Sequence, residues 1–427
     1  MNADRRLQLM SVTETFGKTV IKANKNHPAL SRGILRAGWE AEDLVFRFHP
    51  HKESFPADQY LARLMMDTML APLRTPDQSV ICSIFTPCEL VQEAQLHPYN
   101  VEAFSSYISA SFVESACVQK AEETGISDTL CSYHKTFLGA AENGLMPRPR
   151  CIVYTNVTCD ANLLTFSRLA RLFDVPEFFV QVPSDPSEDA VAYVRDELLS
   201  LKNFLQDVTG CSIDDNALKA RVERSKRTLS SFEAYQRARS DRYVPSDLVT
   251  PLYSAMTANI LLGTKEEETY VNRCLLDLQK AGPKKGKHIY WMHTLPFWSS
   301  AVKKYFLFNE NAQIVGDELS QVCSSDFDAE DPYRGMAQRL VYNALNGPAD
   351  RRIEAGIQHA KQCGADGVIW FNHWGCKHTL GMAQLAKAGF EDAGLPTLLL
   401  DGDGCDRAHG GEGQTLTRIG AFLENLV

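Results

Sequence analysis

The chain has 427 residues, of which 44% are hydrophobic and 23% charged, and its formal net charge is −9. This composition is typical of a globular protein with room for two domains of ordinary size. The acidic balance, with no run of more than two basic residues, argues against the basic face that a nucleic-acid partner needs. No apolar stretch long enough for a membrane span occurs and no signal-peptide segment is evident, which predicts a cytoplasmic protein.

Short apolar runs alternate with amphipathic sequence in the first half of the chain. Residues 79–85 and 151–157 are predicted strands because branched and aromatic residues crowd a short run, and 176–183 has the same character. Residues 161–175 have the apolar spacing of a helix, and a proline-led helix is expected after the first strand. Strands that alternate with helices predict a parallel sheet covered on both faces.

A second half repeats this pattern after a helical connection. Residues 187–242 are mostly charged and are predicted to be helical. Four further strands are expected beyond them, at 288–296, 311–318, 366–375 and 396–403. We therefore predict two doubly wound, parallel-sheet α/β domains of the Rossmann or flavodoxin-like type with a helical segment between them. The N-terminal domain, with its helical N-terminus and the connecting segment, is expected at 1–245, and the C-terminal domain at 246–427.

Twelve cysteines are present, and none forms a C-x-x-C pair, so short-spaced zinc or ferredoxin-type sites are not indicated. Cys159 and Cys376 each come just after a predicted strand, and Cys131 begins a helical segment. Ligands collect outside the carboxyl ends of parallel strands, so three thiols from both halves could meet in the cleft between them. Three thiolates would leave a coordination position open, as catalytic metal sites require, although a buried cysteine also packs well as a small hydrophobe.

Several sequence blocks resemble a known superfamily. CSYHKTFLGAAENG, TNVTCDAN, FNHWGCKHTLGM and DGDGCDRAHGGEGQTLTRIGAFLENL follow one another as in the 2-hydroxyacyl-CoA dehydratase and benzoyl-CoA reductase superfamily, and SIFTPCEL is also similar to it. The resemblance covers about residues 75–427. It implies a 4Fe-4S cluster held by three cysteine thiolates, which here match Cys131, Cys159 and Cys376. It also implies a dimer, with a related second subunit or with a second copy of the chain, and a separate ATP-dependent iron-sulfur activator protein.

The resemblance implies a hydro-lyase that acts on an acyl-CoA thioester. A 2-hydroxyacyl thioester has no acidic β-hydrogen, so one electron passed to the thioester would let a ketyl radical expel the neighbouring hydroxyl. A cluster iron without a fourth thiolate suits a Lewis acid and electron donor. Ser83 and Glu102 match polar residues of the family's cleft and are the expected catalytic side chains. From the sequence alone, Ser83 is equally a satisfied strand-end hydroxyl, and Glu102 reads more readily as an exposed helix carboxylate.

Alternatives remain open at this point. One branch of the superfamily carries a double-cubane 8Fe-9S cluster, reduces small molecules and needs extra cysteines. Candidates exist, but their local motifs do not match that branch, so a single cubane is favoured: Cys88, Cys117, Cys151, Cys323 and Cys405. A benzoyl-CoA reductase-type subunit is a further alternative. A subunit that only relays electrons or supports a catalytic partner is another.

Histidines and tryptophans accompany these motifs. His134 and His373 each lie three residues from a predicted ligand and could donate a hydrogen bond to a cluster sulfur, but neither is predicted to be a ligand. No P-loop pattern is present, so ATP hydrolysis is assigned to the activator. Four tryptophans near the predicted strand ends indicate either core packing or an interface with a second chain: Trp291, Trp298, Trp370 and Trp374.

Overall fold

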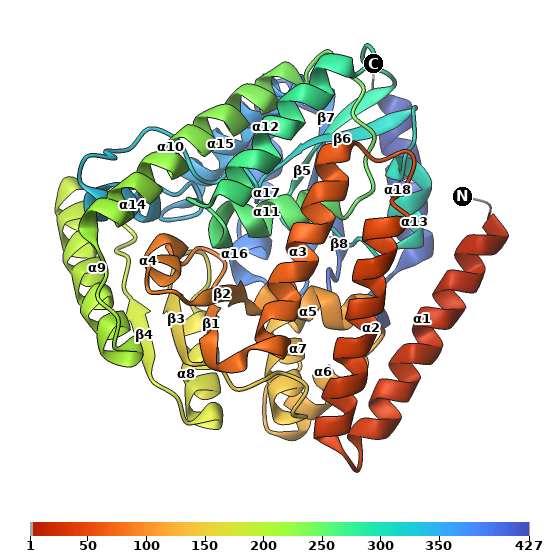
Figure 1. Cartoon of the computed structure of the whole chain (residues 1–427). Helices are drawn as coiled ribbons and strands as arrows, with labels where there is room; N and C mark the ends of the chain where they lie inside the picture. The colour runs from red at the N-terminus through yellow and green to blue at the C-terminus, as the bar shows by residue number, and fades with distance from the viewer. Residues whose placement is uncertain (1–2, 427) are drawn as a thin grey trace.

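The computed structural model describes residues 3–426, and in it each half of the chain builds a four-stranded parallel sheet (Figure 1). The first sheet has the order β2-β1-β3-β4, with β1 (Ser79–Cys82), β2 (His97–Asn100), β3 (Cys151–Thr155) and β4 (Glu177–Val180). The second has the order β6-β5-β7-β8, with β5 (Lys287–Met292), β6 (Ala312–Asp317), β7 (Gly367–His373) and β8 (Thr397–Gly402). Both orders reverse beside their first strand, which confirms the predicted doubly wound α/β class.

Helices cover both faces of the sheets. In the first part of the chain these are α1 (Ala3–Asn24), α2 (Pro28–Phe48), α3 (Pro56–Arg74), α4 (Cys88–Glu93), α5 (Val101–Ala110), α6 (Glu114–Glu123), α7 (Ser132–Glu142) and α8 (Ala161–Phe173). The later ones are α11 (Thr250–Ile260), α12 (Lys265–Lys280), α13 (Ser300–Phe306), α14 (Pro332–Val341), α15 (Ala349–Gln362), α16 (Lys377–Leu380), α17 (Ala383–Asp392) and α18 (Glu412–Asn425). The predicted helical connection is the pair α9 (Glu188–Thr209) and α10 (Asp215–Ala238).

Alternate strand residues of the first sheet face two separate apolar cores. Val80 and Val153 lie in one core and Ile81 and Ile152 in the other, and all four are fully buried. Successive side chains of a strand point to opposite faces, so a strand buried on both sides reads as a continuous apolar run. This is why β1 and β3 could be predicted from their composition.

The edge strand β2 was not predicted. Its sequence, HPYN, is short and contains Pro98, which cannot donate a backbone hydrogen bond. The strand pairs only with β1, at the edge of the sheet, where a missing donor is tolerated. Its pairing follows from the rest of the fold rather than from its own sequence.

Packing between the halves does not follow the sequence order throughout. Residues of the 319–345 segment, including Phe327, Met336 and Val341, join the core of the first sheet, and α14 packs on α9 and α10 (Figure 1). The predicted domain boundary near residue 245 is not tested by this packing and stays a prediction. Within residues 3–426, no helix has both the length and the apolar character needed to cross a membrane.

The glycine-rich stretch before α18 fastens the second half to the first. Ser109 on α5 donates to the Cys405 carbonyl at 2.7 Å, and Ser132 on α7 donates to Asp403 Oδ1 at 2.6 Å. Arg407 donates to Glu114 Oε1 at 2.6 Å and lies over the ring of Phe112. These contacts fix the position of α7 relative to the ends of β7 and β8.

Removing the Arg407 clamp should destabilise the fold. In an Arg407→Ala variant, the Glu114 carboxyl, whose side chain is 5% exposed, would lose its cation. We expect the free energy of unfolding to fall by about 2–4 kcal/mol, measured by urea denaturation. The exposed Lys387–Glu391 pair offers a matched control, because Lys387→Ala should change stability by less than about 1 kcal/mol. Equal, small effects of the two variants would contradict the clamp.

Candidate functional site

Three cysteines lie where the chain leaves regular structure, after a strand or directly before a helix. Cys159 follows β3 and precedes α8, Cys376 follows β7 as the residue before α16, and Cys131 immediately precedes α7. All three are partly exposed, whereas seven of the other nine cysteines are buried. β3 and β7 each adjoin the strand where the order of their sheet reverses, the position at which doubly wound sheets bind ligands.

A backbone contact and mutual electrostatic effects show that these three thiols lie close together. Gly375, in a left-handed conformation with φ of 83°, packs so closely on Cys131 that a Cβ there would lie 2.5 Å from the Cys131 nitrogen. Burial raises the pKa of the Cys131 thiol, and the neighbouring Cys376 and Cys159 raise it further. Burial and Cys376 likewise raise the pKa of Cys159 to about 12. The structure thus gathers thiols from both halves, separated by 217 residues between Cys159 and Cys376, at one site.

His373 points its ring at the Cys131 sulfur. The His373 Nε2 lies 3.1 Å from Cys131 Sγ, and its Nδ1 accepts a hydrogen bond from the Gly404 backbone at 3.0 Å. Because Nδ1 is an acceptor, the proton of the neutral ring sits on Nε2 and is donated to the sulfur. Burial lowers the pKa of His373, which keeps this tautomer neutral. The side chain is therefore a fixed donor to Cys131 rather than to its sequence neighbour Cys376.

His134 has the opposite polarity. Thr165 donates to the Ala161 carbonyl, so its oxygen accepts a hydrogen bond from His134 Nδ1 at 3.0 Å. The unprotonated Nε2 then faces Cys159 Sγ at 3.5 Å and can accept the thiol proton. Burial, followed by the electrostatic effect of the nearby His373, lowers the pKa of His134 to about 4. Each histidine thus contacts the sulfur of a cysteine that is distant from it in sequence.

Glu102 is more shielded than its sequence predicts. It lies in the first turn of α5, where Asn100 caps the helix by accepting the Ala103 N–H. Burial raises the pKa of its carboxyl to about 7 even though its own N–H and that of Ile84 favour the charged form. Its Oε2 is buried and has no hydrogen-bond partner. The prediction of an exposed Glu102 carboxylate was wrong, because the side chain turns back toward the end of β1. The charge of Glu102 also raises the pKa of Cys159.

Ser83 lies at the carboxyl end of β1 and is almost fully buried. Its Oγ accepts the Thr155 N–H at 3.0 Å. Thr86 donates to the Val153 carbonyl, so Ser83 in turn donates to Thr86 Oγ1 at 3.0 Å. Both polar functions of the hydroxyl are engaged in joining β1 to β3.

The remaining candidates have surroundings of their own. Cys88, Cys117 and Cys151 are buried in the helices and strand of the first half. Cys405 contacts Thr136 and the Ser105 carbonyl, and Cys323 contacts Asn259. Among the tryptophans, Trp291 and Trp370 are core residues, Trp298 donates to the Gly404 carbonyl, and Trp374 is exposed beside the site.

Sequence reasoning missed the residues that hold these groups in place. Asp403 accepts hydrogen bonds from Ser132 and from the backbone of Cys405 and Asp406. The DGDGCD motif carried a signal, because a carboxylate between glycines at a strand end is suited to capturing backbone N–H groups. Among residues 3–426, no three His, Cys, Asp or Glu side chains are placed to bind a single metal ion.

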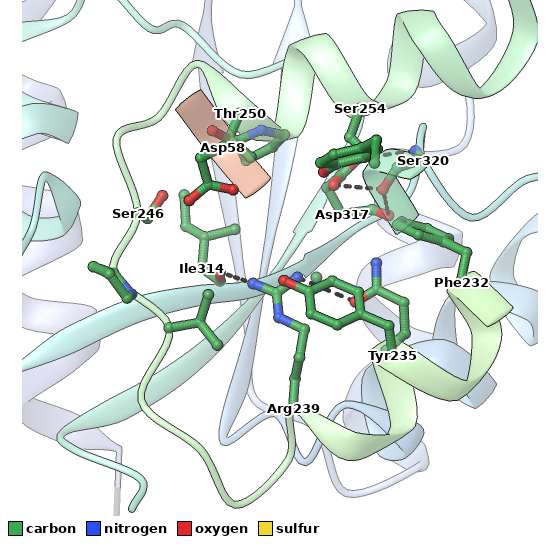
Figure 2. Close-up of a pocket in the computed structure, with 16 residues that line it drawn as sticks. Asp58, Phe232, Tyr235, Arg239, Ser246, Thr250, Ser254, Ile314, Asp317 and Ser320 are labelled. Atoms are coloured by element: carbon green, nitrogen blue, oxygen red, sulfur yellow. Dashed lines mark hydrogen bonds between the residues drawn. The ribbon is translucent and has the colours of Figure 1, made fainter. Parts of the chain in front are cut away.

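A separate polar cavity lies between α3, α10 and β6. Figure 2 shows Asp58, Asp317 and Arg239 around it. Asp317 accepts a hydrogen bond from Ser320, and Arg239 donates one to the Ile314 carbonyl. Its volume of about 30 Å³ holds one or two water molecules and excludes an acyl-CoA. Burial raises the pKa of Asp58 to about 8. The cavity has no cysteine in its lining and is distinct from the thiol site.

Comparisons with known proteins show which family the chain resembles. The family model for the 2-hydroxyglutaryl-CoA dehydratase D-component matches residues 83–426. The chain is 20% identical to the (R)-2-hydroxyisocaproyl-CoA dehydratase alpha subunit of Clostridioides difficile, over 80% of this chain and 88% of that protein. It is 20% identical to the alpha subunit of the (R)-phenyllactyl-CoA dehydratase of Clostridium sporogenes, over 72% and 80% of the two chains. To the beta subunit of that enzyme it is 23% identical, over 83% and 93%.

Proposed function

The chain belongs to the 2-hydroxyglutaryl-CoA dehydratase D-component family, and from that premise we propose that it is a subunit of a 2-hydroxyacyl-CoA dehydratase. In this proposal Cys131, Cys159 and Cys376 hold a 4Fe-4S cluster. The observation that carries it is the gathering of three partly exposed thiols from both halves of the chain at the ends of two parallel sheets. Similarity to both alpha and beta dehydratase subunits supports a role within a multi-subunit enzyme.

The residues around the thiols fit such a group. The sulfur of Cys131 receives the His373 N–H, as expected for a thiolate that carries charge. The three cysteines approach from separate elements, which suits a cluster whose thiolates bind different irons rather than one ion. When bound, the cluster would supply the single electron that lets a 2-hydroxyacyl-CoA lose its hydroxyl by a ketyl radical route.

Glu102 is the proposed proton carrier of the site. Its pKa of about 7 lies near the operating pH, where a carboxyl exchanges protons most effectively. The buried Oε2 has no hydrogen-bond partner, so no neighbouring donor fixes its protonation state. Ser83 has a supporting role here, because its hydroxyl fixes the end of β1, from which Ile84 donates to Glu102.

We propose that a related second subunit covers the site and that a separate ATP-dependent activator supplies the electron. Apolar side chains remain exposed on the elements that flank Cys159 and Cys376: Leu163, Leu164, Trp374, Leu380 and Leu385. A radical intermediate needs shielding from water, and a second chain seated on these side chains would provide it.

A reconstituted assay tests this assignment. We expect anaerobic dehydration of a 2-hydroxyacyl-CoA only when this chain, its related subunit, the activator and ATP are all present. The chain carries no P-loop pattern, so ATP alone should give no multiple turnover. Light scattering should show a dimer after coexpression. Sustained dehydration by this chain as a monomer with ATP alone would contradict the proposal.

A further inference from the structure

The third cysteine has a polar neighbour that the sequence did not single out. Cys376 Sγ lies 3.4 Å from Thr379 Oγ1, at the start and near the end of the short helix α16. Thr379 is fully buried. Cys376 therefore receives its side-chain contact from a hydroxyl, whereas Cys131 and Cys159 receive theirs from histidines.

A buried arginine fixes this hydroxyl. Arg352 on α15, 2% exposed, donates through Nη1 to Thr379 Oγ1 at 3.2 Å and to His378 Nδ1 at 2.9 Å. Its Nε and Nη2 form a bidentate pair with Glu318 at 2.6 and 2.7 Å, and its guanidinium lies over the ring of Trp370. The pair is neutral overall, but its positive end faces the threonine and the sulfur.

The Thr379 hydroxyl suits a Cys376 sulfur that is bound to iron and carries no hydrogen. A hydroxyl whose oxygen accepts the Arg352 N–H has its own hydrogen left to donate. Among residues 3–426, the Cys376 sulfur is the only partner besides Arg352 within hydrogen-bond reach of the Thr379 hydroxyl. As a free thiol, Cys376 donates its S–H to Thr379 Oγ1, and the hydroxyl hydrogen is left without a strong acceptor. A Cys376 sulfur bound to iron carries no hydrogen and can accept the one on Thr379.

We propose that Thr379, oriented by the Arg352–Glu318 pair, is a positioning residue that donates its O–H to the Cys376 thiolate and raises the reduction potential of the cluster. The proposal rests on the proposed function, in which Cys376 is a cluster ligand. A reduced cluster carries one more negative charge, which is partly borne by its sulfurs. A hydrogen bond to a sulfur therefore stabilises the reduced form more than the oxidised form.

The test compares three variants of the full chain, reconstituted anaerobically with iron and sulfide. Thr379→Val removes the hydroxyl and keeps the shape, whereas Thr379→Ser keeps the hydroxyl. Met382→Leu is the matched control, because Met382 also contacts Arg352 Nη1, at 3.8 Å, and leaves the bond to sulfur in place. Each protein is measured for iron content and for midpoint potential, by redox titration followed with electron paramagnetic resonance.

We expect all three variants to bind as much iron as the wild type. Only Thr379→Val should titrate at a more negative midpoint potential, with altered resonance Raman frequencies of the iron–thiolate bonds. An unchanged potential and spectrum in Thr379→Val would overturn the inference. Loss of iron from Thr379→Val with an unchanged circular dichroism spectrum would also overturn it, because the hydroxyl would then serve retention rather than potential. A wild-type chain that binds no iron would instead overturn the proposed function, and the inference with it.

Discussion

Replacing Cys159 by serine should remove most of the iron bound by the chain and abolish dehydration, while the fold survives. Cys159 is partly exposed, and among residues 3–426 its sulfur has one side-chain hydrogen-bond partner, His134, so exchange of sulfur for oxygen costs little packing. A serine hydroxyl is a far poorer iron ligand than a thiolate at neutral pH. With two thiolates left, the site no longer has the number of ligands that we propose.

The control for this variant is another cysteine on the surface. Cys211 is exposed in the turn between α9 and α10, and Cys211→Ser should keep both iron and activity. Iron and sulfide analysis after anaerobic purification, with circular dichroism as the check on folding, distinguishes the two cysteines. Full iron and full activity in Cys159→Ser would show that Cys159 is a packing residue.

Replacing Glu102 by glutamine should make the protein more stable at pH 8 but strongly impair catalysis. The carboxyl has a pKa of about 7 in the fold against the ordinary 4.5. Folding therefore favours the protonated carboxyl. Its contribution to the free energy of unfolding is fully present below pH 4.5 and is lost as the pH rises through 7. At pH 8 the wild type carries a shielded charge that glutamine lacks, so Glu102→Gln should gain up to about 3 kcal/mol. At pH 4.5 or below the two proteins should be nearly equal.

The turnover number distinguishes a catalytic Glu102 from a carboxyl that is only buried. Loss of a proton carrier should lower the turnover number of the reconstituted enzyme by about 100-fold or more, with its iron content unchanged. Glu267 is the matched control, because burial raises its pKa to about 8 and its Oε2 also lacks a partner. Glu267→Gln should gain stability at pH 8 and keep its activity. Equal activities of the two variants would remove Glu102 from the proposed mechanism.

The strands that carry the site could be predicted because burial on both faces leaves a clear record in composition. β3 and β7 are buried throughout and mostly apolar, so the positions of Cys159 and Cys376 at their ends followed from the sequence. Cys131 has no such strand before it, and the sequence placed it only at the start of a helical segment before the motif resemblance added support. Its place beside Cys376 depends on Gly375, whose missing Cβ admits the backbone of Cys131.

The partners of the thiols could not be predicted from spacing. His373 is three residues from Cys376 yet donates to Cys131, because Gly404 holds the other side of its ring. His134 is three residues from Cys131 and faces Cys159. Such pairings depend on how two domains dock, and the docking is set by contacts nearly 300 residues apart in sequence, such as Ser109 with Cys405.

The central claim is that Cys131, Cys159 and Cys376 together hold one 4Fe-4S cluster, and metal analysis of the anaerobically purified wild-type chain tests it most directly. Iron, acid-labile sulfide and the electron paramagnetic resonance spectrum of the reduced protein would be measured on the same sample. The account predicts about four iron and four sulfide per chain with the signal of a single cubane. A chain without iron after anaerobic reconstitution, or one with about eight iron and the signal of a double cubane, would contradict it.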